Sequence, residues 1–143
     1  MNRATRAAMI AAAALMLAAG PAAAQAPATV AIDAPAAVGG DGAGFRPKEL
    51  LLNALAGCTG MDVISILAKM RCEPAAFRVE VRAEESDEHP KVFTAFHITY
   101  FIKGNVPAEK LEKAIELSQE RYCGVTAMFR SFATVTHEVV VEG

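Results

Sequence analysis

A long apolar segment with few charges runs from Glu49 to Cys72 and reads ELLLNALAGCTGMDVISILAKMRC. Pro47 suits the first turn of a helix, where its missing N–H is no loss, and Pro74 cannot continue one. The segment therefore predicts a helix from Pro47 to about Met70. Because apolar side chains cover nearly all of its circumference, we expect it to be a buried central helix.

Two glycines lie in the middle of this helix, with Cys58 and Thr59 between them. Gly57 and Gly60 each cost about 0.8–1.0 kcal/mol relative to alanine inside a helix, so close packing or access to the sulfur must compensate. At about 100° per residue, Cys58 lies on the one polar stripe of the helix. The other members of this stripe are Asp62, Ser65 and Lys69.

The rest of the chain alternates between strand-like and helix-like patterns. Apolar and charged residues alternate in two segments joined by the turn Ser86–Pro90, which predicts an antiparallel hairpin. The expected elements are strand Ala28–Pro35, helix Pro47–Met70, strands Ala76–Ser86 and Lys91–Gly104, helix Val106–Cys123, short helix or turn Gly124–Phe132 and strand Ala133–Glu142. This order predicts an α+β domain.

The length and charge of the chain limit the class of protein. With 143 residues it is long enough for one domain with its own core. Its net charge of −2 leaves no basic surplus, so we expect neither nucleic acid nor an anionic membrane as a partner. The three cysteines are an odd number and cannot all pair within one chain.

The first 24 residues have the organisation of a secretory signal. Two arginines precede an apolar run from Ala7 to Ala19, and small residues follow a Gly–Pro break. The run is shorter than the ~20 residues of a membrane span, so we expect no span there. We predict a signal-peptide-like segment 1–24 and a domain 25–143 that is periplasmic or secreted, where thiol pairs tend to oxidise. The alternative is an Ala-rich tail or a misassigned start codon on a cytoplasmic protein.

The residues alone leave the state of the cysteines open. Cys58 lies about three turns from the helix start, so the helix dipole cannot activate its thiol. Asp62 on the same stripe opposes thiolate formation unless its charge is neutralised. Cys123 ends a predicted helix beside Arg121, and Cys72 has no flanking signature. An inert buried thiol is the alternative to a reactive one at each position.

Metal-ligand spacing is absent from the sequence. A site made of Cys58, Cys123 and one histidine would have neither the CxxC nor the HExxH pattern, so no metal and no cofactor are expected. Each histidine is expected to be a turn or strand residue; the three are His89, His97 and His137.

The segments RPKELLLNALAGCTGMDVISILAKMR and AIELSQERYCGVTAMF together resemble the OsmC/Ohr family of osmotically inducible and organic hydroperoxide resistance proteins. The resemblance covers about Ala28 to Glu142 and is to the OsmC-like branch with GCTGMDV and RYC motifs. It implies a long central cysteine-bearing helix packed on an antiparallel sheet, in an intertwined homodimer with active sites at the dimer interface. The glycines would then let a neighbouring backbone approach the cysteine helix.

The resemblance also implies a reaction. Cys58 matches the peroxidatic position and Cys123 the resolving position of thiol-dependent peroxidases that reduce organic hydroperoxides. The implied partners are the hydroperoxide and a dithiol reductant, which is of the lipoyl type in some members. The pocket for the apolar tail of the peroxide is expected to contain Met61, Phe129 and Phe132.

Two departures from the peroxidase branches concern the charges around the thiol. Their first hairpin carries an arginine that pairs with the thiolate, and we expect this hairpin to be missing because the signal-like segment precedes Ala28. Their acidic residue directly follows the helix-start proline, whereas here Lys48 follows Pro47 and Glu49 comes one residue later. The expected supporting residues are Glu49, Asp62 and Arg121, and a substitute cation would come from Arg46, Lys48, Arg121 or Arg130.

A non-catalytic member of the same fold is the second interpretation. In that case the chain binds an apolar ligand, or its Cys58–Cys123 pair is a structural disulfide. Export and the missing arginine favour this alternative. A structural disulfide would resist a dithiol that readily reduces a catalytic pair.

Overall fold

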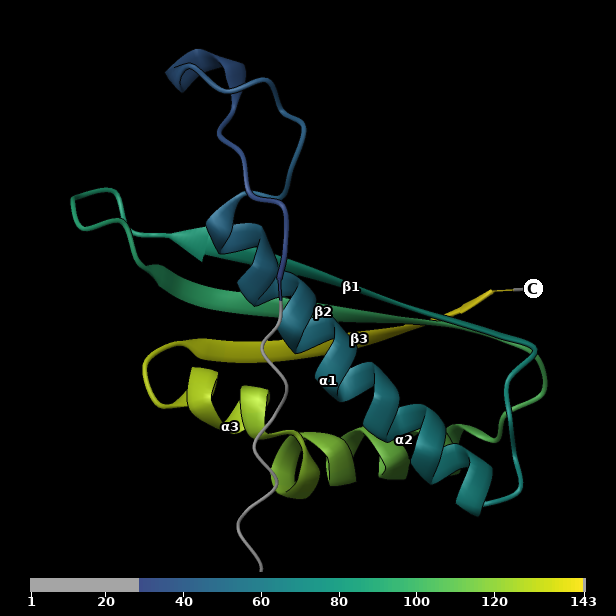
Figure 1. The fold of residues 1–143 in the computed structure, drawn as a ribbon. Coiled ribbons are helices and arrows are strands. Elements are labelled where there is room, and N and C mark those ends of the chain that lie inside the picture. Colours follow the sequence, from purple (N-terminus) through teal and green to yellow (C-terminus); the bar gives the residue numbers. More distant parts are fainter. Residues whose placement is uncertain (1–28, 143) are drawn as a thin grey trace, which may run out of the picture. The chain divides into compact units, whose positions relative to one another are not determined.

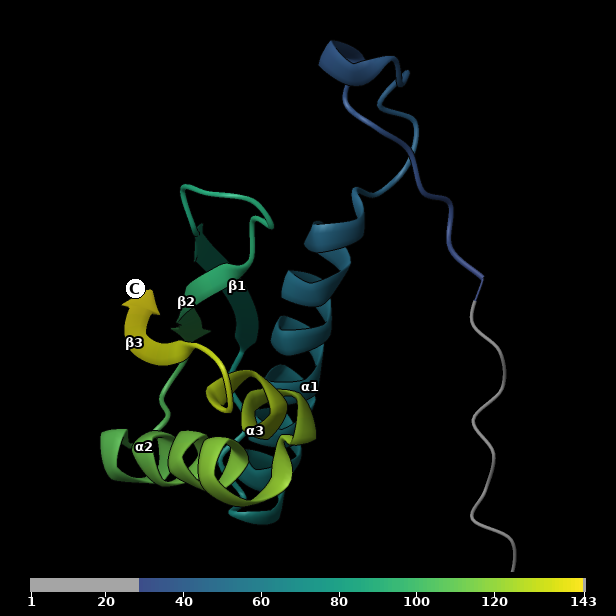
Figure 2. The same ribbon diagram turned by 90° about the vertical axis from the view of Figure 1, so that its left-hand side faces the viewer.

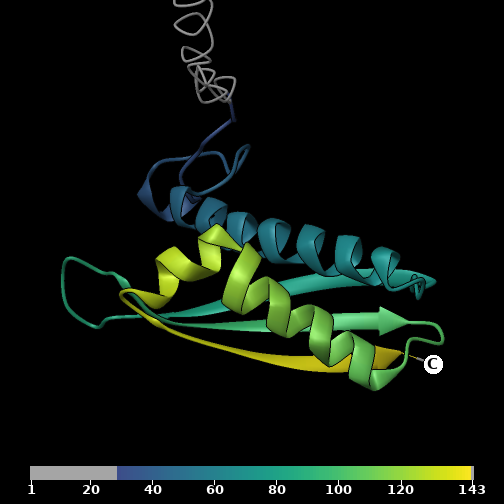
Figure 3. The ribbon, with the colours of Figure 1, turned by 90° about the horizontal axis from the view of Figure 1, so that it is seen from below.

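The computed structural model describes residues 29–142, so the expected signal-like segment 1–24 lies outside the described residues. The chain divides after Val30, and the unit described below begins at Ala31. Its elements are η2 (Ala36–Val38), α1 (Pro47–Lys69), β1 (Ala76–Glu85), β2 (Phe93–Lys103), α2 (Ala108–Leu117), η3 (Ser118–Tyr122), α3 (Gly124–Arg130) and β3 (Thr134–Glu142). The α+β prediction is confirmed, because the helices lie on one face of a three-stranded sheet (Figure 1 and Figure 3).

The long helix α1 begins and ends close to the predicted residues. At its start, the backbone N–H of Arg46 donates to the carboxylate of Glu49 at 3.1 Å, which satisfies one free amide of the first turn. At its end, Arg71 adopts the left-handed conformation with φ of 55°. The backbone N–H of Cys72 then returns to the carbonyl of Leu67 at 3.1 Å. This reversal stops the helix before Pro74.

One face of α1 is buried, rather than the whole circumference that the sequence predicted. Leu55, Val63 and Leu67 are fully buried among the core residues of β2 and α2, whereas Met61 on the opposite side is 76% exposed. By length and composition α1 would also pass as a membrane span, but its buried face makes it the core helix of this unit. The helices α2 and α3 pack against α1 on the same side of the sheet (Figure 2).

The two glycines of α1 have different surroundings. A Cβ on Gly60 would lie 3.2 Å from Cγ2 of Val79, so the small residue lets β1 pack closely against the helix. A Cβ on Gly57 would meet nothing within 4 Å, because this residue is on the exposed side of α1. The close approach expected from the sequence therefore exists at Gly60, and the neighbour is a side chain of the same chain's β1.

The sheet has the order β1-β2-β3 and is mixed, which corrects the expected antiparallel sheet. The predicted hairpin is confirmed, since β1 and β2 pair antiparallel with Val79 opposite Tyr100. The closing strand β3 pairs parallel to β2, with Val139 opposite Tyr100. The long connection through α2, η3 and α3 is the physical reason, because it returns the chain to the starting end of β2, as parallel pairing requires.

The expected strand Ala28–Pro35 is wrong for the described residues. From Thr29 onward this segment has only an isolated bridge between Ile32 and Phe45. The carboxylate of Asp33 accepts the backbone N–H groups of Ala34, Asp41 and Ala43 at 2.7, 3.1 and 2.8 Å. These bonds fold the glycine-rich segment into a loop in place of a strand. Within residues 29–46, the structure has a loop with one isolated bridge before α1.

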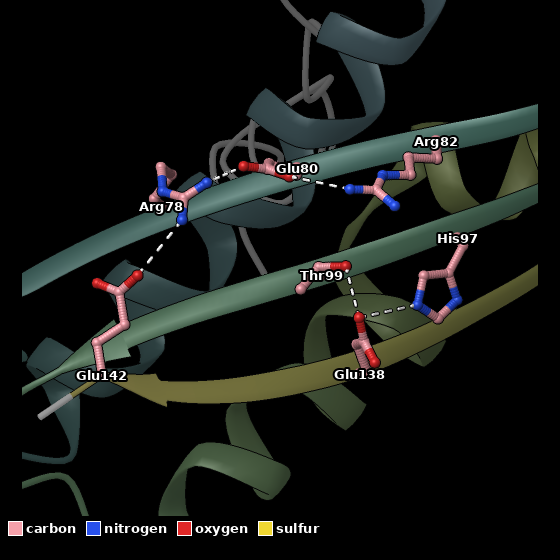
Figure 4. Close-up of polar contacts among 7 residues, drawn as sticks. All are labelled: Arg78, Glu80, Arg82, His97, Thr99, Glu138 and Glu142. Carbon is pink, nitrogen blue, oxygen red and sulfur yellow. Dashed lines mark hydrogen bonds and ion pairs between the residues drawn. The ribbon is translucent and has the colours of Figure 1, made fainter.

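The face of the sheet away from the helices is polar (Figure 4). Arg78 on β1 forms ion pairs with Glu80 on the same strand and, at 3.3 Å, with Glu142 on β3. On the same face, Glu138 of β3 accepts the hydroxyl of Thr99 at 3.0 Å and lies 3.4 Å from His97. The Thr99 hydrogen bond, followed by that of His97, lowers the pKa of Glu138. Such exposed pairs stabilise little, but they keep this face hydrophilic and leave the core to the helix side.

The close contact at Gly60 gives a first prediction. Gly60→Val should lower the free energy of unfolding by about 1–3 kcal/mol, because the added side chain is forced against Val79. Urea denaturation of the reduced protein measures this loss. Trimming the neighbour in the double variant Gly60→Val/Val79→Ala should destabilise less than the sum of the two single changes. Strictly additive losses would contradict close packing at this point.

Candidate functional site

Two cysteines and one carboxylate, distant in the sequence, come together between α1 and the start of α3. The Sγ atoms of Cys58 and Cys123 and a carboxylate oxygen of Asp62 all lie within 4.8 Å of one another. Cys58 and Asp62 are one helical turn apart on α1 and are both half-buried, whereas Cys123 is 2% exposed. The polar stripe predicted from the sequence is therefore where the second cysteine meets α1.

A π-helical turn puts Cys123 in this position. The sequence predicted one helix from Val106 to Cys123, but α2 ends at Leu117 and η3 continues it with wider turns. The backbone N–H of Cys123 donates to the carbonyl of Ser118 at 2.7 Å, five residues back. Such wide turns inside helices are uncommon and are often found at functional sites.

The thiol of Cys123 has two opposing influences. Its Sγ accepts the backbone N–H of Thr126 at 3.3 Å, as the N-cap of α3. Burial raises the pKa of the Cys123 thiol, the adjacent Thr126 lowers it, and the neighbouring Cys58 adds to the increase. Since desolvation is the largest cause, the protonated thiol is favoured at Cys123. The hydroxyl of Thr126 is itself buried and has no hydrogen-bond partner within the described residues.

A chain of buried hydroxyl groups runs beside the cysteines. The hydroxyl of Thr59 lies 2.5 Å from the hydroxyl of Tyr100 and 3.0 Å from that of Ser118. Ser118 donates in turn to the carboxylate of Asp62 at 3.2 Å. Gln119 extends the chain by donating its side-chain N–H to the Tyr100 hydroxyl at 3.3 Å. Thr59, Tyr100 and Ser118 are fully buried, so these bonds fix α1, β2 and η3 relative to one another.

Arg130 joins this network at its far end. Its guanidinium donates to the backbone carbonyl and the side-chain oxygen of Gln119 at 3.1 and 2.8 Å, and it pairs with Glu120 at 2.6 Å. Within residues 29–142, no arginine or lysine donates a hydrogen bond to the sulfur of Cys58 or Cys123. Of the four candidate cations, Arg130 is therefore connected to the site, but only through Gln119 and Tyr100.

The other candidate cations and Glu49 are occupied elsewhere. Glu49 pairs with Arg46 at 3.1 Å, about two and a half turns of helix before Cys58. Lys48 pairs with Glu85 at 2.8 Å. Arg121 is exposed, with its guanidinium 5.6 Å from the ring centre of Tyr122. Of the two expected acidic supporting residues, the structure brings Asp62 and not Glu49 to within 4.8 Å of both sulfurs.

A groove of about 430 Å³ extends from Asp62 along the polar stripe of α1. It lies between α1 and the segment formed by α2 and η3. Apolar side chains share its wall with the polar stripe, and the lining residues are Asp62, Ser65, Ile66, Lys69, Met70, Leu117 and Tyr122. The groove thus offers an amphipathic channel that begins beside the two thiols.

The three residues expected in the peroxide pocket lie apart from this groove. Met61 points from the exposed side of α1. Phe129 stacks on Phe96 with ring centres 4.6 Å apart, and Phe132 packs on Phe129 at 5.6 Å. Phe129 is buried and Phe132 is exposed, so this aromatic cluster reaches from the core to the surface at α3.

Cys72 and two of the histidines make contacts away from the thiol pair. Cys72 donates its S–H to the carbonyl of Leu67 at 3.6 Å, just after α1. The ring of His137 lies against Tyr100 with centres 6.1 Å apart, and His97 pairs with Glu138 on the outer face of the sheet. The third side chain beside Cys58 and Cys123 is the carboxylate of Asp62, and none of the histidines within the described residues belongs to this cluster.

Four residues of the site were missed in the sequence: Thr59, Tyr100, Ser118 and Gln119. Each is a polar residue inside an otherwise apolar helix face or strand face, and this is the signal that could have found them. Burying a hydroxyl or amide without a hydrogen-bond partner costs several kcal/mol. Polar residues on buried faces are therefore expected to lie close together and to bond to one another. Their pairing, however, spans three elements and cannot be deduced from spacing.

Comparison with known proteins assigns the chain to a family. A family model described as OsmC-like protein matches residues 39–138. The chain belongs to the OsmC-like family. Protein YhfA of Escherichia coli K12 is 32% identical over 96 residues, which cover 66% of this chain and 72% of YhfA. The family predicted from the two cysteine motifs is thereby confirmed.

Solved structures share the fold of this chain. A hypothetical protein from Aquifex aeolicus VF5 is 35% identical, with a TM-score of 0.64 over 71% of this chain and 78% of that protein. An organic hydroperoxide resistance protein OsmC from Legionella pneumophila, also described as a predicted redox protein, is 17% identical. Its TM-score is 0.62 over 78% of this chain and 81% of that protein, and at this identity it shows the fold alone.

The buried hydroxyl chain gives a second prediction. Tyr100→Phe removes the hydroxyl that contacts Thr59 and Gln119, and it should lower the free energy of unfolding by about 1–2 kcal/mol. The loss stays moderate because Thr59 keeps its bond with Ser118 and the side-chain oxygen of Gln119 keeps its bond from Arg130, although the side-chain N–H of Gln119 loses the Tyr100 hydroxyl. Tyr122→Phe is the matched control, since Tyr122 is 54% exposed, and it should change stability by less than about 0.5 kcal/mol. Equal effects of the two changes in urea denaturation would contradict the role of the network.

Proposed function

We propose that this OsmC-like protein is a thiol-dependent peroxidase that reduces organic hydroperoxides. The observation that carries the proposal is the pair of thiols, Cys58 and Cys123, whose sulfurs lie within 4.8 Å of each other on different elements. The family and the paired thiols together support a redox-related role in general. The name of the Legionella pneumophila structure supports organic hydroperoxides as the substrate class.

The difference in burial between the thiols supports their separate roles. Cys58 is half-buried and lies one helical turn from Asp62, which lines the groove, so Cys58 is the more accessible of the two thiols. Attack breaks the O–O bond, releases the alcohol and leaves a sulfenic acid on Cys58. Cys123 is buried beside it and then displaces water from the sulfenic acid to form a disulfide. The buried resolving thiol is protected from reacting with peroxide first.

Closing the disulfide requires a local movement. An S–S bond is about 2.05 Å long, so sulfurs up to 4.8 Å apart must approach by rotation of side chains or by a shift of the segment around Cys123. That segment lies between η3 and α3, where the helix is already interrupted. An external dithiol of the lipoyl type then reduces the protein disulfide and is itself oxidised to a stable cyclic disulfide.

The groove beside Asp62 is the proposed place for the substrate. Ile66, Met70 and Leu117 suit the apolar tail of a hydroperoxide, and Lys69 at the far end suits an anionic group on the tail. Asp62 at the near end is held in place by the hydroxyl of Ser118, which donates to its carboxylate at 3.2 Å. Met61, Phe129 and Phe132 remain the alternative proposal for the substrate pocket.

A non-catalytic role is the second candidate, and one observation favours it. In the described part of the chain neither sulfur has an arginine or lysine as hydrogen-bond donor, so nothing there supplies the usual cation for a reactive thiolate. In that case the Cys58–Cys123 pair would be a structural disulfide, or the groove would bind an apolar ligand without chemistry.

Counting thiols after adding an organic hydroperoxide tests the peroxidase. The reduced wild type should lose two thiols per chain at least roughly tenfold faster than glutathione, because a thiol held beside a bound hydroperoxide reacts faster than a free thiol in solution. Cys123→Ser should stop at a sulfenic acid on Cys58, and Cys58→Ser should be inert. Cys72→Ser is the matched control and should behave as wild type.

Two results would reject this proposal in favour of the second candidate. One is oxidation no faster than that of glutathione. The other is a Cys58–Cys123 disulfide that a lipoyl-type dithiol fails to reduce.

We also propose that two chains form a dimer through the exposed side of α1. This side carries apolar or small residues at helical spacing, namely Leu51, Ala54, Gly57, Met61 and Ala68. Leu51 and Met61 are 44% and 76% exposed, which is unusual for large apolar side chains in a row on one helix. Gly57, which meets nothing within its own chain, would allow a partner helix to approach closely.

Charge on this side of α1 should prevent the dimer. Leu51→Glu and Ala54→Glu would each bury an unpaired carboxylate at the proposed interface, so dimerisation should weaken at least about tenfold. Sedimentation velocity across a range of protein concentrations measures this. Val92→Glu places the same change at another exposed apolar residue, in the β1–β2 turn, and should leave the dimer intact. A monomeric wild type, or equal effects of all three variants, would contradict the proposed interface.

A further inference from the structure

The three side chains at the thiol pair are also a set of metal ligands. Zinc sites with Zn–S distances of about 2.3 Å and Zn–O distances of about 2.0–2.2 Å place tetrahedral ligand atoms roughly 3.5–3.8 Å apart. The two sulfurs and the Asp62 oxygen lie within 4.8 Å of one another. Closing them around an ion therefore needs movements of about 1 Å, which side-chain rotation supplies without moving the backbone.

The donor chemistry selects the class of metal. Two thiolates and one carboxylate suit Zn²⁺ and similar borderline-soft divalent ions, whereas Mg²⁺ and Ca²⁺ require oxygen ligands. Three protein ligands leave the fourth tetrahedral position for water or an added thiol, as in open zinc sites. Cys58 and Asp62 are half-buried, so an ion can enter from the solvent side, and Cys123 closes the buried side.

The surroundings of these ligands are those of a prepared site. Ser118, which is fully buried, donates to Asp62 at 3.2 Å and is itself held by Thr59 at 3.0 Å. Hydrogen bonds of this kind orient ligating carboxylates in metal sites. On the other side, the N–H of Thr126 donates to the Cys123 sulfur at 3.3 Å. The Thr126 hydroxyl is buried without a partner within the described residues and is available to the same sulfur.

We propose that Cys58, Asp62 and Cys123 form a binding site for one Zn²⁺ ion. The ion supplies the positive charge that no lysine or arginine of residues 29–142 brings to these sulfurs by a hydrogen bond. It holds both thiols as thiolates, and because a disulfide would use the same two sulfurs, the metal-bound form and the disulfide form exclude each other.

Oxidation then releases the metal, a step that rests on the proposed peroxidase. The two coordinated thiolates give up two electrons and become the disulfide. The hydroperoxide takes these electrons with two protons and becomes an alcohol and water, and Zn²⁺ leaves because both sulfur ligands are lost. The site would thus exchange a bound metal for a disulfide.

Cobalt titration of the reduced full-length chain without oxygen tests the binding. One Co²⁺ per chain should bind with sulfur-to-cobalt charge-transfer absorption, and Zn²⁺ should displace it. Cys58→Ser and Cys123→Ser should each lose at least half of this absorption, and Asp62→Asn should weaken binding at least tenfold. Cys72→Ser is the matched control and should bind as wild type.

Three outcomes would overturn the metal site. These are no charge-transfer absorption at one equivalent, a loss of binding in Cys72→Ser, and equal affinity in wild type and Asp62→Asn. Circular dichroism on each variant distinguishes a lost ligand from a lost fold, and Asp62→Asn retains the shape of the side chain if a cysteine variant fails to fold. Because no peroxide is added, failure of the peroxidase proposal leaves this result unchanged.

Discussion

The hydroxyl of Thr59 holds the site together. Placed directly after Cys58, it bonds both to Tyr100 on β2 and to Ser118 at the start of η3. A helix, a strand and a wide helical turn thereby meet at one buried point, and Ser118 passes the constraint on to Asp62. Because all three hydroxyls are fully buried, breaking any one of these bonds would leave unpaired polar groups in the core. The positions of both sulfurs follow from this junction.

The elements of the fold could be predicted because their patterns are local. Proline positions and apolar periodicity gave α1 within a residue, and the alternation in Phe77, Val79 and Val81 gave β1. The partner of β3 could not be predicted, since alternation reveals a half-exposed strand but not its direction. The loop before α1 was predicted as a strand because the hydrogen bonds that shape it are not local. The backbone N–H groups of Asp41 and Ala43 donate to the carboxylate of Asp33 across the glycines between them.

The candidate site was predictable only in part. The polar stripe on α1 located Cys58 and Asp62 on one side, but the link from Cys58 to Cys123 came from the family resemblance and not from spacing. Asp62 appeared in the sequence as an obstacle to a thiolate, and in the fold it becomes the third member of the cluster. Ser118 and Gln119 were missed because their polar character becomes informative only with their burial beside Thr59 and Tyr100.

The π-helical turn η3 makes the length of this segment matter more than its composition. In an ordinary α-helical turn, the carbonyl of Ser118 would accept the backbone N–H of Tyr122, four residues later. In η3 it accepts the backbone N–H of Cys123, five residues later. Deleting one residue between Ser118 and Cys123 would rotate everything after it by about 100° around the helix axis. The second sulfur would then face away from Cys58 even with every other residue retained. Natural variation in this segment is therefore expected to conserve its number of residues more strictly than the identity of its exposed members, Glu120, Arg121 and Tyr122.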